Sequence, residues 1–212
     1  MAEAMRAAKV EEVRADSGAW AFVDLGFSEK AKSCALLLDD GGPQEMTFAD
    51  LRLALRDIVA SDSKPLNLLL EAPLSVAFNR DGNPTGRSIE RRGSEHRYWY
   101  IGLGCSVLVA ATFLVHSLSS LRRRRDVRLV EGLASFKPKG APSSHAGDVL
   151  ALRDVAWSAH SPLGRIVDPA ELAKTPTDRV VSAFAHAGLD LGIPPVVALG
   201  AQQEASRGLP GA

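Results

Sequence analysis

Two apolar segments of the chain each run into an acidic residue. Residues 20–26, WAFVDLG, contain Asp24 shortly before a glycine, and residues 67–71, NLLLE, end in Glu71. Short apolar runs bounded by turn residues are typical of buried strands. Because an ionised carboxylate is costly to bury without a positive or hydrogen-bonding partner, two such strands indicate one shared metal site. The alternatives are that Asp24 caps the turn at Gly26 and that Glu71 forms an ion pair with a helix.

Further acids occur where other predicted elements begin or end. Glu131 directly follows a predicted strand, as the first two acids do. Asp148 lies at the start of a predicted helix, three residues after His145, and Asp178 lies just inside the start of another. Acids at helix starts are favoured by capping and by the helix dipole alone, so Asp148 and Asp178 also have a structural interpretation. We interpret His145 first as a hydrogen-bonding residue at its helix start.

Hydrophobic periodicity predicts a series of strands and helices. The predicted strands cover residues 20–25, 33–38, 45–47, 66–71, 127–130 and 194–199, and the predicted helices cover 48–60, 98–121, 146–157 and 177–189. The Asp-Asp-Gly-Gly turn at 39–42 implies that the first two strands form an antiparallel hairpin. The helix over 48–60 implies a crossover, and therefore parallel pairing, for the strand that follows it.

At 212 residues the chain is long enough for one domain with a substantial core, and a second full domain is not expected. We expect a polar helical extension at residues 1–17, a single domain over 18–199 and a loose tail at 200–212. Residues 76–97 are predicted to form a long polar loop rich in Gly, Asn and Arg. Loops of this length in compact domains are usually either functional or disordered.

The formal charge is zero overall, but positive charge is concentrated in one segment. Residues 80–139 contain 12 Lys and Arg against 5 Asp and Glu, which permits a basic face on a neutral protein. The two cysteines, Cys34 and Cys105, lie in apolar runs and are interpreted as small core residues rather than a disulfide or metal pair. This usage fits a reducing cytoplasm, and the charged first residues lack the apolar core of a signal peptide.

One segment permits a membrane-anchored alternative. Residues 98–121 carry no Asp, Glu, Lys or Arg, and four arginines follow at 122–125. This length without charge meets the first test for a membrane-spanning helix. The serines, glycines and histidine within it favour instead a helix that packs on a sheet and is covered on its other side. We therefore expect no membrane association.

The order of these elements, together with several short motifs, resembles the ribonuclease-H-like fold. The motifs are VDLG at 23–26, EAPLS at 71–75, GRSIERRG at 86–93, RYWYIGLG at 97–104, EGLASFK at 131–137, SSHAGD at 143–148 and TDRVVSAFAHAGLDLGIPPVV at 177–197. Within that fold, the chain is similar over most of residues 18–199 to a predicted-nuclease branch of uncharacterised bacterial proteins. The resemblance implies an α/β fold with a mixed five-stranded sheet, which combines an antiparallel meander with parallel strands and carries helices on both faces.

The resemblance also implies a chemistry, which is metal-dependent hydrolysis of phosphodiester bonds in a nucleic acid with two Mg²⁺ or Mn²⁺ ions. The implied catalytic residues, which are also metal ligands, are Asp24, Glu71 and Asp178. Further implied ligands are Glu131 and Asp148, and residues implied to support the ligands are His145 and Lys137. The basic residues implied to bind phosphates are Arg87, Arg91 and Arg92. The alternative for these arginines is a solvated charged loop.

Other functions stay open at this point. The sequence contains no Walker loop, GxGxxG motif or zinc-type Cys and His spacing, so we expect no organic cofactor. One alternative function is a non-catalytic scaffold of the same fold that binds nucleic acid or protein. The other is a membrane-anchored protein with its span at residues 98–121. A homodimer is also open, because junction-cutting relatives of the fold act as dimers, although the sequence identifies no dimer surface.

Overall fold

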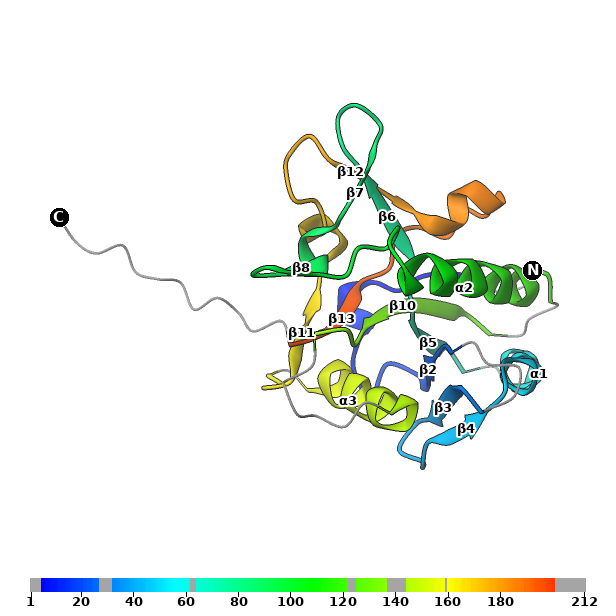
Figure 1. Ribbon diagram of the computed structural model, residues 1–212. Coiled ribbons are helices and arrows are strands. Elements are labelled where there is room, and N and C mark those ends of the chain that lie inside the picture. Colours follow the sequence, from blue (N-terminus) through cyan, green and yellow to red (C-terminus); the bar gives the residue numbers. More distant parts are fainter. Residues whose placement is uncertain are drawn as a thin grey trace.

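The centre of the protein is a mixed β-sheet (Figure 1). The computed structural model describes residues 5–26, 32–61, 64–121, 125–136, 144–158 and 160–200. Across the sheet, five strands lie in the order β4 (Gln44–Met46), β3 (Cys34–Leu38), β2 (Ala19–Asp24), β5 (Leu66–Glu71) and β10 (Val127–Leu133). β3 pairs antiparallel with both β2 and β4, whereas β5 pairs parallel with both β2 and β10. The predicted antiparallel meander and parallel crossover are therefore confirmed.

The sheet continues beyond β10, so that in the described part of the chain it has eight strands rather than the five that the resemblance implies. β13 (Val196–Leu199) pairs parallel with the end of β10, and β11 (Gly164–Val167) pairs antiparallel with β13. β1 (Met5–Ala7) pairs parallel with the start of β10. The predicted helix at residues 1–17 is therefore wrong, because the described part of this segment holds a strand and a short 3₁₀ helix, Val10–Glu12.

Helices cover both faces of the sheet, as expected. α1 (Phe48–Ser61) and α2 (Leu103–Ser119) pack on one face, where their buried residues meet those of β2, β3, β5 and β10. α3 (His145–Trp157) packs on the other face, and Figure 1 shows it on the opposite side of β10 from α2. Among the described residues, no helix combines the length and the apolar character that crossing a membrane requires.

The segment predicted to be a long loop contains regular structure. β6 (Ser75–Phe78) lies at the centre of a small sheet, between β7 (Pro84–Thr85) and β12 (Arg179–Ser182). After a 3₁₀ helix at Ser88–Glu90, the strands β8 (Arg91–Arg92) and β9 (Glu95–His96) form a short hairpin. α2 then begins at Leu103, five residues later than predicted, because residues 99–102 form a turn in which Gly102 has a φ of 58°.

The predicted helix over 177–189 is also wrong. Its first half is β12, in which Val180 and Val181 pair antiparallel with Ala77 and Val76 of β6. Its second half is a 3₁₀ helix, Ala183–Ala187, while a further 3₁₀ helix lies at Pro169–Glu171. Adjacent β-branched valines fit a pleated strand better than a helix, which accounts for the difference.

The expectation that both cysteines lie in the core holds only for Cys34, since Cys105 is exposed on α2.

Candidate functional site

Asp24 and Glu71 are neighbours at the same end of the sheet. They are the last residues of β2 and β5, and the parallel register pairs them directly with each other. Paired residues of adjacent strands project from the same face, so the two carboxylates share a face. That face is the one covered by α3, because Phe22 and Leu69, two positions earlier on each strand, belong to the core beneath α3. The two strand-ending acids are therefore adjacent on one face of the sheet.

The start of α3 adds two more polar side chains. Ser144 is its N-cap, and the Ser144 hydroxyl accepts a hydrogen bond of 3.0 Å from the Gly147 backbone N–H. His145 and Asp148 then lie on one face of the first turn, three residues apart. The Nδ1 atom of His145 lies 3.0 Å from the Oδ2 atom of Asp24, which is only 3% exposed. His145 therefore holds the Asp24 carboxylate from the side of α3.

Gly132 allows α3 to approach the sheet at this point. It is the register partner of Glu71 on β10. A Cβ atom at position 132 would lie 2.8 Å from Leu69 Cδ2 and 3.1 Å from Leu152 Cδ1, and Leu152 is a buried residue of α3. These distances are shorter than ordinary packing contacts, so a larger residue would require the ends of the Leu69 and Leu152 side chains to shift. The glycine thus leaves room for these two leucines to pack between β10 and α3.

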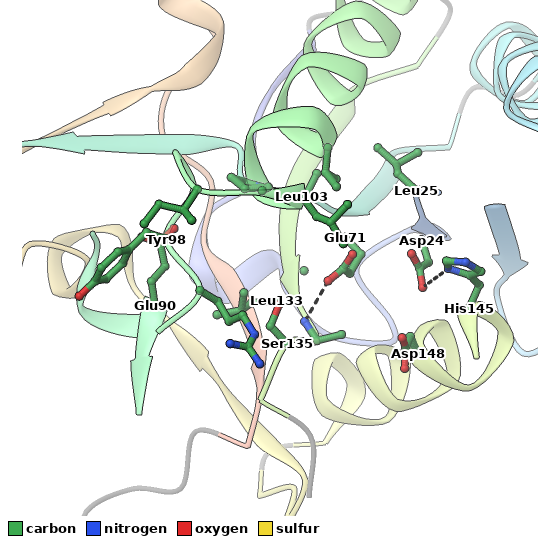
Figure 2. Close-up of a pocket in the computed structure, with 18 of the residues that line it drawn as sticks. Asp24, Leu25, Glu71, Glu90, Tyr98, Leu103, Leu133, Ser135, His145 and Asp148 are labelled. Carbon is green, nitrogen blue, oxygen red and sulfur yellow. Dashed lines mark hydrogen bonds and ion pairs between the residues drawn. The ribbon is translucent and has the colours of Figure 1, made fainter. Parts of the chain in front are cut away.

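These acids line a cavity of about 540 Å³ (Figure 2). Figure 2 shows Asp24, Glu71, His145 and Asp148 on one side of it and Tyr98 on the other. Glu71 Oε1 accepts a hydrogen bond of 3.3 Å from the Ala134 backbone N–H. Ile101, Leu103 and Val107 give the cavity an apolar side, and Arg87, Glu90 and Arg97 also line it.

Glu131 does not share this face of the sheet. It pairs with Leu70 and is one residue out of step with Glu71, so its side chain projects toward the opposite face. There its Oε2 atom accepts hydrogen bonds of 2.8 Å from the Leu74 backbone N–H and from Arg87 Nη1. Arg87 Nη2 lies 2.7 Å from Glu131 Oε1. Glu131 is therefore the partner of a buried arginine, and the expectation that it joins the metal ligands is corrected.

The same buried cluster corrects the expectation for Arg87. This side chain is 0% exposed, so it cannot reach the phosphates of a nucleic acid. Its Nε and Nη2 atoms donate hydrogen bonds of 3.1 and 2.9 Å to Glu90 Oε1, and Nη1 donates one of 2.7 Å to Ser75 Oγ. Arg87, Glu90 and Glu131, which we call the buried ion cluster, therefore join residues 87–90 to β10, and the contact with Ser75 adds β6 as a third segment.

Burial and charge oppose each other in this cluster. Burial by itself lowers the pKa of Arg87, but the charges of Glu131 and Glu90 outweigh it, so the pKa of this guanidinium lies above its ordinary value. Burial raises the pKa of Glu90 despite its contact with Arg87. Two acids and one base thus share a buried site, and the arginine offsets the charge of the acids.

The other implied site residues lie elsewhere. Asp178 is not among the described residues that line the cavity, and its Oδ2 atom accepts a hydrogen bond of 3.1 Å from the Thr175 backbone N–H in an exposed turn before β12. Arg91 and Arg92 are exposed on the β8–β9 hairpin, and Arg92 Nη1 donates a hydrogen bond of 3.1 Å to Phe136 O. Lys137 lies outside the described residues.

The cavity offers the right chemistry for a hard divalent cation, since carboxylate oxygens are the ligands that Mg²⁺ and Mn²⁺ prefer. Asp24, Glu71 and Asp148 supply three such groups from three elements. Within the described part of the chain, however, no three His, Cys, Asp or Glu side chains are close enough together to hold a metal ion. The residue types therefore suit a divalent cation, but the three carboxylates would have to move closer together to coordinate it.

Two features of the site are not expected from the sequence. Gly132 gives no signal, because a single glycine after a strand acid has no distinctive pattern. Glu90 follows Arg87 by three residues, and this spacing, which is that of a local ion pair, is the signal that could have found it.

No protein-family model matches the chain, and no curated protein or solved structure is similar enough to count as a match. The site must therefore be interpreted from its own geometry.

Proposed function

We propose that the protein is a metal-dependent nuclease with a ribonuclease-H-like fold. The observation that carries the proposal is the pairing of Asp24 with Glu71 at the ends of two adjacent parallel strands, in a cavity that Asp148 also lines. Acids from separate elements that converge in this way are the arrangement that metal-assisted phosphodiester hydrolysis needs. The cavity lies at the carboxyl ends of β2 and β5, where open α/β sheets usually bind their ligands.

The strand arrangement supports the fold part of the proposal. A ribonuclease-H-like sheet combines an antiparallel meander with parallel strands, and β4, β3, β2, β5 and β10 are connected in this way. The crossover connections α1 and α2 precede the two parallel strands that follow β2. β1 and β13 join the sheet through β10, and β11 joins it through β13, so these additions leave the paired ends of β2 and β5 in place.

The roles of the chain's residues follow from their contacts. Asp24 and Glu71 would hold one metal ion between them, and Asp148 would replace Asp178 as the acid contributed by a helix. His145 orients Asp24 through its Nδ1 atom, while the Ala134 N–H orients Glu71. When bound, Mg²⁺ or Mn²⁺ ions would activate water and stabilise the charge that develops on the phosphate. Arg91 and Arg92 remain the residues that we propose to meet phosphates outside the cavity.

The proposal is tested by cleavage of labelled DNA and RNA substrates in Mn²⁺, Mg²⁺ or EDTA. The wild type should cut in the presence of either ion and not in EDTA, and Asp24→Asn should abolish cutting. The matched control is Asp154→Asn, which removes the charge of an exposed acid on the same helix as Asp148. This control should cut like the wild type. Cutting that survives in Asp24→Asn, or cutting in EDTA, would contradict the proposal.

A non-catalytic scaffold of the same fold is the second candidate. It is favoured by the finding that no three ligands already form a metal-binding group among the described residues. The two candidates differ in how their stability responds to metal ions. A nuclease should melt at a higher temperature in Mn²⁺ than in EDTA, because ligand binding stabilises the folded state. A scaffold with the same acids but no metal should show the same melting temperature in both.

A further inference from the structure

Three aromatic rings form a column beside the cavity. They belong to His96, the last residue of β9, and to Tyr98 and Tyr100, which lie between β9 and α2. The His96 and Tyr98 rings lie 4.9 Å apart with 25° between their planes, and the Tyr98 and Tyr100 rings lie 5.5 Å apart with 14° between theirs. Near-parallel rings at these distances are stacked. We call these three residues the aromatic column.

The intervening residue holds the column in place. Trp99 Nε1 donates a hydrogen bond of 3.0 Å to Thr85 O, and the Trp99 backbone N–H donates one of 3.2 Å to Glu90 Oε1. The Trp99 ring also meets the Phe78 ring edge-on at 6.0 Å. This residue therefore fixes the segment to the β6–β7 sheet and to the buried ion cluster, so the column does not depend on a ligand for its order.

The column is accessible and connects to the acidic site. Tyr98 lines the cavity that Asp24 and Glu71 also line, on the side opposite to them (Figure 2). His96 stacks on Tyr98 and is exposed, so the outer end of the column faces solvent. A stack of rings that only stabilised the fold would gain most by being fully buried, because burial of apolar surface is what stabilises it. Here the last ring of the stack is left open.

Positive charge accompanies the rings. The Lys174 ammonium lies 5.1 Å from the centre of the Tyr98 ring, and Arg97 lines the cavity. Arg91 is the register partner of His96 in the β8–β9 hairpin, so both side chains lie on one face of it. Stacked aromatic rings with cations beside them are the combination that binds single-stranded nucleic acids, where rings meet bases and cations meet phosphates.

From these contacts we propose that the aromatic column is a stacking surface for unpaired nucleobases, so that the substrate is single-stranded nucleic acid. The proposal deepens, and rests on, the assignment of the cavity as a nuclease site. A strand whose phosphate lies at Asp24 and Glu71 passes the edge of Tyr98 and places a neighbouring base on the open outer face of His96. Bases within a duplex are already stacked and paired, so a duplex cannot use the column.

The test measures binding without cleavage. Asp24→Asn protein is titrated in EDTA with a fluorescently labelled single strand of mixed sequence and with the same strand annealed to its complement. The single strand should bind at least about 10-fold more tightly than the duplex. His96→Ala, added to Asp24→Asn, should weaken binding of the single strand about 5- to 10-fold, since base stacking on one ring contributes at least that much. Its affinity for the duplex should stay unchanged.

Two matched variants separate stacking from other effects. His96→Tyr keeps an aromatic ring and should retain the affinity for the single strand. Phe113→Ala removes another exposed ring, 52% exposed on α2, and should leave both affinities unchanged. Equal loss for both substrates in His96→Ala, no loss at all, or tighter binding of the duplex would overturn the proposal.

The cleavage assay of the wild type keeps the two proposals apart. If the wild type cuts with Mn²⁺ but prefers duplex, the nuclease stands and the stacking surface fails. If His96→Ala selectively weakens single-strand binding while the wild type cuts nothing, the stacking surface stands and the nuclease fails. A protein that neither binds nor cuts any substrate overturns both.

Discussion

Glu71 and Glu131 have the same sequence pattern and opposite surroundings. Each ends or follows an apolar run of a central strand, and the two strands are neighbours in the sheet. Glu71 faces α3 and an open cavity, whereas Glu131 faces the other side and is sealed against Arg87. A shift of one residue in register separates these outcomes, because side chains alternate between the faces of a strand. One face of the sheet end is thus available for chemistry, and the other holds the structure together.

The largest effect should come from disrupting the buried ion cluster, which should lower the stability of the protein. Arg87→Met leaves Glu90 and Glu131 buried without their cation, and removing one partner of a buried ion pair typically destabilises a protein by about 3–5 kcal/mol. Urea denaturation should show this loss of unfolding free energy. The matched control, Arg91→Met, changes an exposed arginine nearby and should stay within about 0.5 kcal/mol of the wild type. A similar stability for both variants would contradict the structural role of Arg87.

Substitutions of the acids that line the cavity should change the cleavage activity instead of the stability. Asp148→Asn should lower the rate of metal-dependent cleavage by about 100-fold, because the acid lines the cavity with Asp24 and Glu71. Asp178→Asn should leave the rate unchanged, since this acid closes an exposed turn. Single-turnover cleavage in Mn²⁺ compares the two directly. The opposite ranking would return the helix-borne ligand to Asp178, as the family resemblance implies.

The pH dependence of stability should report on the ionisation of Glu90 in the buried ion cluster. Burial raises the pKa of Glu90, so folding favours its protonated form. The protonated Glu90 side chain therefore contributes its full stabilisation below the ordinary glutamate pKa of about 4.5. This stabilisation is lost as the pH rises through the higher pKa that Glu90 has in the folded protein. Glu90→Gln cannot ionise, and its unfolding free energy relative to the wild type should increase as the pH rises above about 4.5. Urea midpoints at several pH values measure the difference, and a constant difference would contradict it.

The smallest effect should come from the exposed arginines. Arg91→Gln and Arg92→Gln should each weaken nucleic-acid binding about 2- to 3-fold at moderate salt, with little dependence on sequence. Because each substitution removes a cation that meets a phosphate, it should also reduce the salt dependence of single-strand binding by about 0.7 in the log–log slope. Anisotropy titrations at several NaCl concentrations test this. An unchanged slope would mean that these side chains are solvated surface charges.

Local patterns in the sequence are sufficient to predict the elements that carry the proposed site. The apolar runs before Asp24 and Glu71, the turn at 39–42 and the periodicity of α1 and α3 are all short-range signals, and each predicted element exists. The Ser144 N-cap is likewise visible in the sequence. Convergence of Asp24 and Glu71 follows because adjacent parallel strands end at the same edge of a sheet.

Long-range pairings are not visible in the sequence. β12 forms because Val180 and Val181 meet β6, about a hundred residues earlier in the chain, and without that partner the segment has a helical appearance. The sealing of Arg87 by Glu131 has the same origin, since the two residues lie 44 positions apart. Which face of β10 carries Glu131 depends on its register with β5, and register is decided by packing across the whole sheet.

The pairing of β1 with β10 has a consequence for how the chain folds during synthesis. The partner residues of β1, Val127–Leu129, emerge from the ribosome much later than β1 itself, and Arg6 is likewise 120 residues away from its ion-pair partner Asp126. Contacts at this separation form late and slow the overall rate of folding. β1 must therefore wait for the middle of the sheet, and this segment is exposed to proteases and chaperones in the interval.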